Sequence, residues 1–484
     1  MVFNQQNMNK NIILLLVTVA LTLSACEKIL DKQPTDKLSI SDLFKDVPGA
    51  KTALAGAYSD LLTEAHYMRN TMVYTDLLAG NIKYSKTTNN RLEEVYNVIQ
   101  TPILSPMNET YSSLYEELNN VNNIIFYTPS AEGSTLEKVK ILAEAKCLRA
   151  LIHFDLVRIF ARPFNYTANA SHPGIAVILK PQLFGDPPPV RASVAETYQV
   201  IINDLMEAIS SFDDTNKGVL NGTVKQNFFT KSSAKALLAK VYLNANKWDD
   251  AYSTADEIIK SNQYSLLTNA TYVASWTGRI PSSESIFEIA IENNFNSTGL
   301  GGYFELSNTT YRQYAAAADL TGLYSSSDIR RGATMFNPIT INSVAYLFSK
   351  KYAAGASGQT PIKVLRLSEL YLIRAEAAAE KASPDFTQAN ADLNAIRRRG
   401  DASTANINLT TKDALIDGVL LERRKELAFE GNLLYDLARR KKNIVRVDCT
   451  SQNCNINADD YRLVMPIPSN TIIANRSMVQ NQGY

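Results

Sequence analysis

The chain has few of the residues that most enzyme sites use. Its 484 residues include only three histidines, four cysteines and two tryptophans. The histidines are widely scattered, and the pattern around His153 favours a buried structural residue. No His-Glu-x-x-His pair, glycine-rich phosphate loop or Gly-x-Ser-x-Gly elbow is present. Asp319 and Asp328 lack the ordered oxygen-rich loop of a calcium site. The sequence therefore favours a protein without catalytic residues, metal or cofactor.

An excess of charge of either sign is also missing. The chain has 49 lysines and arginines against 48 aspartates and glutamates, mixed along its length. Without a basic stripe, the sequence disfavours a nucleic-acid partner. At 45% hydrophobic residues, the chain has enough apolar surface to build a large folded core.

A long membrane-spanning run is absent, but a short apolar run lies near the N-terminus. Residues 12–23 are apolar and too short to span a bilayer, and they lead into Leu23-Ser24-Ala25-Cys26. This layout is typical of a secretory signal, and the cysteine makes it similar to a bacterial lipobox. We expect residues 1–25 to be a signal peptide, Cys26 to be acylated, and residues 26–47 to form a tether. An ordinary secreted protein with an incidental cysteine is the alternative.

The other cysteines separate by context. Cys147 lies in an apolar helical pattern and is interpreted as a small buried hydrophobe. Cys449 and Cys454 lie close together in a polar segment, and an exported chain would allow them to form a disulfide. A metal site would need further ligands nearby, and the sequence offers none.

Helical periodicity dominates from residue 48 onward. A long helix is predicted over residues 135–160, and Ser193 with Glu196 predicts a capping box for the next helix. Two helix pairs, residues 232–244 with 248–261 and 365–380 with 386–399, are similar to tetratricopeptide repeats. Generic helical hairpins would explain the same alanines. The predicted fold class is mostly α, with tetratricopeptide-like helix pairs forming an α-α superhelical scaffold.

Residues 263–361 break this periodicity. Polar residues and aromatics increase, and only residues 285–291 alternate like a strand. So long an irregular insertion favours a functional surface, which we predict to be a loop-rich ligand-binding face on a domain spanning 48–484. Its candidate ligand-contacting residues are Trp276, Tyr303, Phe304, Tyr311, Tyr314 and Tyr324. The same rings would serve equally well to pin the segment onto the core.

Three carboxylates at helical spacing raise the possibility of a glycosidase. Glu422, Glu426 and Glu430 fall on one face of a predicted helix. Arg423 and Arg424 lie within helical reach, and arginine neighbours oppose the raised pKa that a general acid needs. The ion-pair interpretation is therefore favoured.

Several segments, in order along the chain, resemble the SusD/RagB family of outer-membrane nutrient-binding lipoproteins. The sharpest is Glu-Arg-Arg-Lys-Glu-Leu-Ala-Phe-Glu-Gly at residues 422–431. The segments that carry the resemblance are residues 26–34, 143–157, 234–243, 365–377, 422–431, 465–468 and 481–484. The resemblance implies a helical scaffold that binds oligosaccharides, or peptides in some members, without breaking bonds. It also implies a SusC-like TonB-dependent barrel transporter as partner.

In this family the loop after the early helices contributes to binding, which adds Asp76, Asn81, Tyr84 and Tyr96 to the candidates. The chain departs from glycan-binding members in its scarcity of tryptophan. We therefore expect a surface-exposed, lipid-anchored outer-membrane protein that binds an oligomeric nutrient, most simply an oligosaccharide, and delivers it to the transporter. The alternatives are an oligopeptide or glycopeptide receptor, a lipid-anchored glycoside hydrolase, and a purely structural adaptor.

Overall fold

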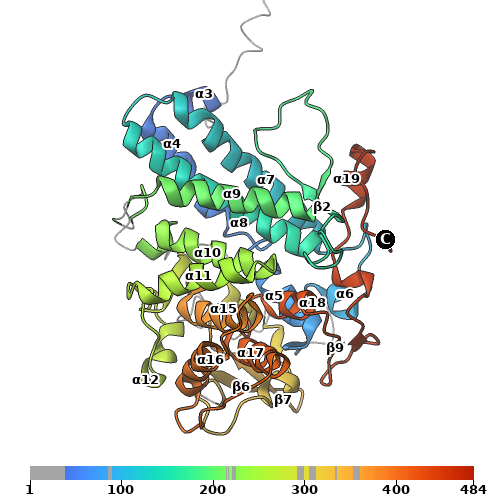
Figure 1. Cartoon of the computed structure of the whole chain (residues 1–484). Helices are drawn as coiled ribbons and strands as arrows, with labels where there is room; N and C mark the ends of the chain where they lie inside the picture. The colour runs from blue at the N-terminus through green and yellow to red at the C-terminus, as the bar shows by residue number, and fades with distance from the viewer. Residues whose placement is uncertain are drawn as a thin grey trace, which may run out of the picture.

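The computed structural model describes residues 39–85, 90–213, 215, 217–220, 225–291, 299–304, 312–332, 335–352 and 360–484. Helices stack in layers from one end of the molecule to the other (Figure 1). The first layers are α3 (Ile40–Leu43), α4 (Val47–Asp60), α7 (Met107–Tyr127), α8 (Thr135–Phe160) and α9 (Val194–Ser211). Helix α8 has the predicted bounds. It buries His153, whose pKa is lowered to about 3 by burial and by Arg149.

The lower layers contain the two predicted repeat-like pairs. The pairs are α10 (Lys231–Asn244) with α11 (Trp248–Lys260) and α15 (Leu367–Glu380) with α16 (Phe386–Gly400), and α17 (Lys412–Glu426) follows them. Helix α10 packs on α9 and α11, and α11 packs on α15, so the pairs continue one stack. Ala239 with Ala251, and Ala377 with Ala389, are fully buried where the paired helices approach. The predicted mostly helical, tetratricopeptide-like fold class is confirmed.

Side chains fix where several of these helices begin. Ser193 Oγ accepts from the Glu196 amide at 3.2 Å, and Glu196 accepts from the Ser193 amide at 2.8 Å. Two amides that the helix itself leaves unpaired are thereby satisfied. The capping box predicted for α9 is confirmed.

Shorter helices lie around the stack (Figure 1). They are α5 (Asn70–Ala79), α6 (Glu93–Asn97), α12 (Asn269–Tyr272), α13 (Leu300–Phe304), α14 (Ala318–Thr321), α18 (Leu433–Arg439) and α19 (Ser469–Ala474). Helix α5 packs against α18, which brings an early segment beside a late one (Figure 1). Among the described residues, every helix is too short or too polar to cross a bilayer.

Strands form small antiparallel pairs. These are β1 (Ile82–Tyr84) with β5 (Tyr314–Ala316), β2 (Pro173–Ala176) with β3 (Arg191–Ser193), β4 (Ser285–Ile289) with β8 (Ile362–Arg366), β6 (Phe336–Ile341) with β7 (Val344–Ser349), and β9 (Ile444–Val445) with β10 (Asn455–Ile456). Strand β4 falls within the predicted strand segment. The β6–β7 hairpin was not predicted. Its turn residues, Asn342 and Ser343, have φ values of 48° and 64°, and Asn-Ser is a weaker turn signal than Asn-Gly.

A buried ion-pair network, which we call the Glu426 hub, ties the 263–361 segment to α17. Glu426 binds Arg366 at 2.8 Å, Arg399 at 2.5 Å and Arg330 at 3.1 Å. Glu430 binds Lys351 at 2.6 Å. The hub therefore fastens the irregular segment through charge as well as through apolar packing.

The ion-pair interpretation of these carboxylates is correct, but the partners expected from helical spacing are wrong. Arg423 binds Asp436 at 2.8 Å, and Arg424 donates to Asn81 at 2.9 Å. The cations that surround Glu426 come instead from segments far away in the sequence, because tertiary packing aims α17's acidic face inward.

Candidate functional site

The predicted aromatic residues gather into one connected row of rings. Ring centroids are 4.9 Å apart for Tyr96–Tyr84, 6.0 Å for Tyr84–Tyr314 and 5.9 Å for Phe304–Tyr314. We call this row the aromatic chain; in spatial order it consists of Tyr96, Tyr84, Tyr314, Phe304, Tyr352 and Trp276, with Tyr303 packed beside Tyr314. Residues far apart in the sequence thus converge although the sequence shows no periodicity there.

Most of the aromatic chain lies inside the protein. Tyr303, Phe304 and Tyr314 have no exposed surface, and Trp276 is 1% exposed. Tyr324, whose hydroxyl donates to the Lys425 carbonyl at 2.9 Å, is also buried. The expectation that these rings form an open face is therefore corrected, because the rings pack on one another and on the core. Tyr311 and the lipidation candidate Cys26 lie outside the described residues.

Tyr303 links the inner rings to charged groups nearer the surface. Its hydroxyl donates to Glu64 at 2.7 Å and accepts from Arg69 at 3.1 Å, and Arg69 also pairs with Glu64. The carboxylate of Glu64 is 37% exposed. The described structure thus gives Tyr303 a defined structural role.

Tyr84 is the member of the chain that reaches the surface. It is half-buried on β1, and its hydroxyl donates to the carbonyl of the exposed residue Arg91 at 2.6 Å. Burial, followed by the neighbouring Tyr314, raises the pKa of Tyr84, so the hydroxyl stays neutral. Next to it on β1, Lys83 Nζ lies 5.5 Å from the ring centre of half-exposed Tyr346. Lys83 and Tyr84 are consecutive strand residues and project to opposite sides of β1, and we call them, together with Arg91 and Tyr346, the β1 surface.

The sequence did not single out Arg91 or Tyr346. Strand β7, which carries Tyr346, was not predicted, and no local motif marks either residue. Alternation within β7 could have shown that Tyr346 and Phe348 share a face.

Asp76 and Asn81 are buried and hold the backbone together. Asp76 accepts from the Phe429 amide at 2.5 Å and from Asn81 Nδ2 at 3.2 Å. Phe429 itself has a positive φ of 67°. Burial raises the pKa of Asp76 to about 7. As placed, neither side chain offers a surface to a ligand, so their predicted ligand contact is corrected to a supporting role beneath β1.

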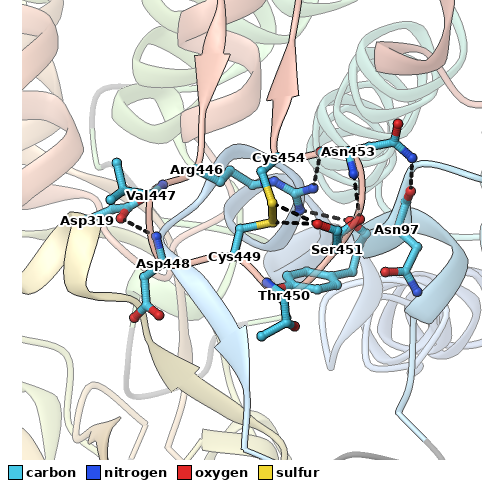
Figure 2. The surroundings of a disulfide bond; sticks show 11 residues. Asn97, Asp319, Arg446, Val447, Asp448, Cys449, Thr450, Ser451, Asn453 and Cys454 are labelled. Carbon is cyan, nitrogen blue, oxygen red and sulfur yellow. Dashed lines mark hydrogen bonds between the residues drawn. A yellow bond between two sulfur atoms is a disulfide. The ribbon is translucent and has the colours of Figure 1, made fainter.

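A disulfide joins Cys449 to Cys454, as the sequence predicts, with 5.9 Å between the Cα atoms. Figure 2 shows the loop that it closes. Asp319 accepts from the amides of Val447 at 2.7 Å and Asp448 at 2.9 Å, so this carboxylate is occupied by backbone donors. The loop is thereby fixed against α14.

The same loop is also fastened to the outer end of the aromatic chain. Arg446 donates to the Tyr96 carbonyl at 2.8 Å and lies over the Tyr96 ring. Asn453 donates to the Asn97 carbonyl at 2.7 Å (Figure 2). Because Asp448 pairs with Lys83 at 2.7 Å, the disulfide loop also buttresses the β1 surface.

The Glu426 hub is unsuited to acid catalysis. Burial alone would raise the pKa of Glu426, but Arg399, Arg366 and Arg330 outweigh it and hold the pKa well below its usual range. A general acid needs the opposite shift. Within the described residues, no group of three or more His, Cys, Asp or Glu side chains is placed to hold a metal ion.

Two family profiles match the chain. Residues 29–243 match the one described as "Starch-binding associating with outer membrane", and residues 324–484 match the one described as "SusD family". SusD-like protein P38 of Formosa agariphila is 23% identical, covering 98% of this chain and 99% of that protein. The starch-binding protein SusD of Bacteroides thetaiotaomicron is 31% identical over 136 residues, which cover 26% of this chain and 22% of that protein.

Solved structures agree in fold. A SusD superfamily protein from Bacteroides thetaiotaomicron has a TM-score of 0.81 at 25% identity, covering 90% of this chain and 99% of its own. A laminarin-binding SusD-like protein has a TM-score of 0.70 at 21% identity, and the match covers 91% of this chain and 100% of that protein. With the stacked helix pairs and the ordered segments of sequence similarity, these matches establish that the chain belongs to the SusD/RagB family.

Proposed function

We propose that this protein is an outer-membrane lipoprotein that binds an oligosaccharide at the cell surface and delivers it to a TonB-dependent transporter. One observation carries the proposal: residues 29–243 match a profile described as starch-binding and associated with the outer membrane. The names of two similar proteins, which refer to starch and to laminarin, support a glycan as ligand.

The β1 surface is the proposed contact site. A tyrosine ring offers a flat apolar face to the C–H groups of a sugar and a hydroxyl for hydrogen bonding. Half-exposed Tyr84 and Tyr346 supply such rings, while Lys83 and Arg91 supply donors for sugar hydroxyls. Because the disulfide loop and the buried rings hold β1 from below, a ligand would meet a preorganised surface, which reduces the entropy cost of binding.

Calorimetric titration tests the ligand class. The chain from residue 27 onward would be titrated with laminari-oligosaccharides, malto-oligosaccharides and a set of short peptides, and the mixtures analysed for cleavage. Saturable binding of a glycan without shortened products supports the proposal. Saturable binding of peptides alone would favour the oligopeptide receptor, and shortened glycans would establish a hydrolase.

Substitutions test the contact site. Tyr84→Ala and Tyr346→Ala should each weaken glycan binding by about tenfold, which corresponds to about 1.4 kcal/mol. Tyr252→Ala provides a matched control, because Tyr252 is a half-buried tyrosine on α11, outside the β1 surface. Unchanged affinity in both β1 variants, with melting temperatures close to the parent, would rule out this surface.

The anchor and the transporter have separate tests. In the native bacterium, Cys26→Ser should abolish incorporation of a labelled fatty acid and release the protein from the outer membrane, because the thiol is the proposed acyl acceptor. The parent protein should copurify with a TonB-dependent barrel from detergent-solubilised outer membranes at near-equal amounts. An unlabelled parent protein, or one recovered without the barrel after cross-linking, would contradict the respective part of the proposal.

A further inference from the structure

A cavity of about 230 Å³ lies where the end of α8 meets α9, α10 and α18. The segment around residues 458–464 completes its wall. The apolar side chains that line it are Val157, Ala161, Phe164, Leu434, Leu463 and Val464. The cavity uses none of the β1 surface residues, so it is a separate site from the proposed glycan surface.

Two polar groups in this cavity wall lack partners within the described structure. Tyr198 is 5% exposed, and its hydroxyl makes no hydrogen bond to any described residue. The Oδ1 atom of Asn165 is buried without a partner, while its Nδ2 donates to the Arg439 carbonyl at 2.8 Å. The Tyr198 hydroxyl opens onto the cavity and can donate to a bound acceptor, whereas Asn165 Oδ1 is an acceptor and takes no part in binding an anion.

An arginine forms part of the cavity wall. The Arg158 guanidinium carbon lies 4.0 Å from the ring centre of Phe154 and 4.4 Å from that of Tyr435. Nη2 of Arg158 is paired with Asp155, and Nη1 has no hydrogen bond to any described residue. The stacked guanidinium is therefore held rigidly with one donor nitrogen left over.

The charges around the cavity favour an anion. Arg162 donates at 3.0 Å to the carbonyls of Asp459 and Asp460, and these bonds leave its charge unneutralised. Lys441 has no ion pair within the described residues. Asp459 is the only carboxylate that lines the cavity among the described residues. The charges of Arg158 and Arg439 are neutralised by Asp155 and Glu376, which lie behind the wall. The lining thus carries a positive excess.

We propose that this cavity is a binding site for a small aromatic carboxylate. Its flat ring would fill the space among Phe164, Tyr198 and Tyr435, and its carboxylate would accept from Arg158 Nη1 and the Tyr198 hydroxyl. A sugar fits this site poorly, because it carries a hydroxyl on nearly every carbon and the mostly apolar wall would leave several unpaired. A neutral hydrocarbon would leave the donors unused.

Calorimetry with benzoate tests the site directly. Sodium benzoate should bind the parent protein saturably with one site, benzyl alcohol should bind at least tenfold more weakly, and glucose should show no binding at this site. Ala438→Phe places a ring in the cavity from α18 and should abolish benzoate binding. Tyr198→Phe removes the hydroxyl while keeping the ring and should weaken benzoate binding about fivefold.

Tyr242→Phe is the matched control, because Tyr242 lies on α10 away from the cavity lining. Benzoate affinity should be unchanged in this variant. The proposal is overturned if the parent protein does not bind benzoate at millimolar concentration, if benzyl alcohol binds as tightly, or if Tyr198→Phe and Ala438→Phe both retain parental affinity. Should Ala438→Phe fail to fold, Tyr198→Phe with its control decides the outcome.

Discussion

The aromatic chain and the α8 cavity are both rich in aromatic rings, yet they differ in what surrounds those rings. In the aromatic chain the rings contact one another, and the hydroxyls of Tyr84, Tyr303 and Tyr314 have protein partners. In the cavity, the Tyr198 ring packs against Phe164 at 5.2 Å, but space remains beside it and its hydroxyl is unpaired. The difference teaches that aromatic content does not identify a binding site. Trp276 Nε1 in the aromatic chain is also unpaired within the described structure, so it is the open space beside the Tyr198 ring that distinguishes the cavity.

The largest expected effect concerns the hub at the inner end of the aromatic chain. Arg366 and Lys351 lie 5.2 and 4.6 Å from the Trp276 ring centre and both contribute to the hub. Glu426→Ala leaves several buried cations without their carboxylate, so it should reduce the free energy of unfolding by about 3–5 kcal/mol in urea denaturation. Exposed Glu116→Ala on α7 is the control and should cost less than about 0.5 kcal/mol. Equal effects would refute the structural role of the hub.

Replacing one ring in each region compares the two directly. Phe304→Ala should destabilise the protein by about 3–5 kcal/mol, because it empties a closed site in the core. Phe164→Ala should cost about 1–2 kcal/mol, because that ring is half-buried and already borders a void. Thermal or urea unfolding of both variants measures the difference. If Phe164→Ala lost more unfolding free energy than Phe304→Ala, the aromatic chain would not be the more tightly packed of the two regions.

The wall behind the cavity contains a titratable group that should make stability depend on pH. His66 bonds to Glu117 at 2.8 Å and to Asp155 at 3.2 Å, and Asp155 also holds Arg158. Burial lowers the pKa of His66, but Glu117 and Asp155 outweigh it and raise the pKa from 6.5 to about 9.

Because the folded pKa exceeds the unfolded one, charged His66 contributes stability that is complete below about pH 6.5 and lost as pH rises through about 9. At about 1.4 kcal/mol per unit, this loss is about 3 kcal/mol. Histidine ring chemical shifts should show His66 titrating near pH 9, while His153, with a pKa near 3, serves as an internal control and stays neutral from pH 6 to 10. Titration of His66 near its usual value would contradict this prediction.

A stability effect smaller than those at Glu426, Phe304 and His66 is expected at the disulfide. Replacing both Cys449 and Cys454 with serine removes a short cross-link, for which loop entropy gives about 2 kcal/mol. The loop remains fastened by Asp319 and Arg446, so glycan affinity at the β1 surface should fall less than it does in Tyr84→Ala. Unfolding and titration of the double variant measure both effects. A loss of binding larger than that of Tyr84→Ala would show that the cross-link itself shapes the surface.

Local features of the fold could be predicted from the sequence, whereas contacts between distant segments could not. Helix α8, the repeat-like pairs and the capping box at Ser193 depend on spacing within one segment. The arginines around Glu426 come from residues 330, 366 and 399, and no local pattern links them to α17.

The candidate site shows the same limit. The sequence identified most of the rings that meet in the aromatic chain, but Phe304 also packs on Tyr352, which no pattern singled out, and on Phe429, which lies in a distant segment. The α8 cavity could not be predicted, because it is enclosed by segments as far apart as Val157 and Val464.

Hydrogen–deuterium exchange with the best-binding oligosaccharide is the most direct test of where the protein captures its ligand. We expect added glycan to slow amide exchange in peptides that cover β1, residues 90–97 and β7, and to leave the already buried segment around Trp276 unchanged. Glycan-dependent protection confined to other surfaces, or shortened oligosaccharide in the same samples, would contradict capture without cleavage at the β1 surface.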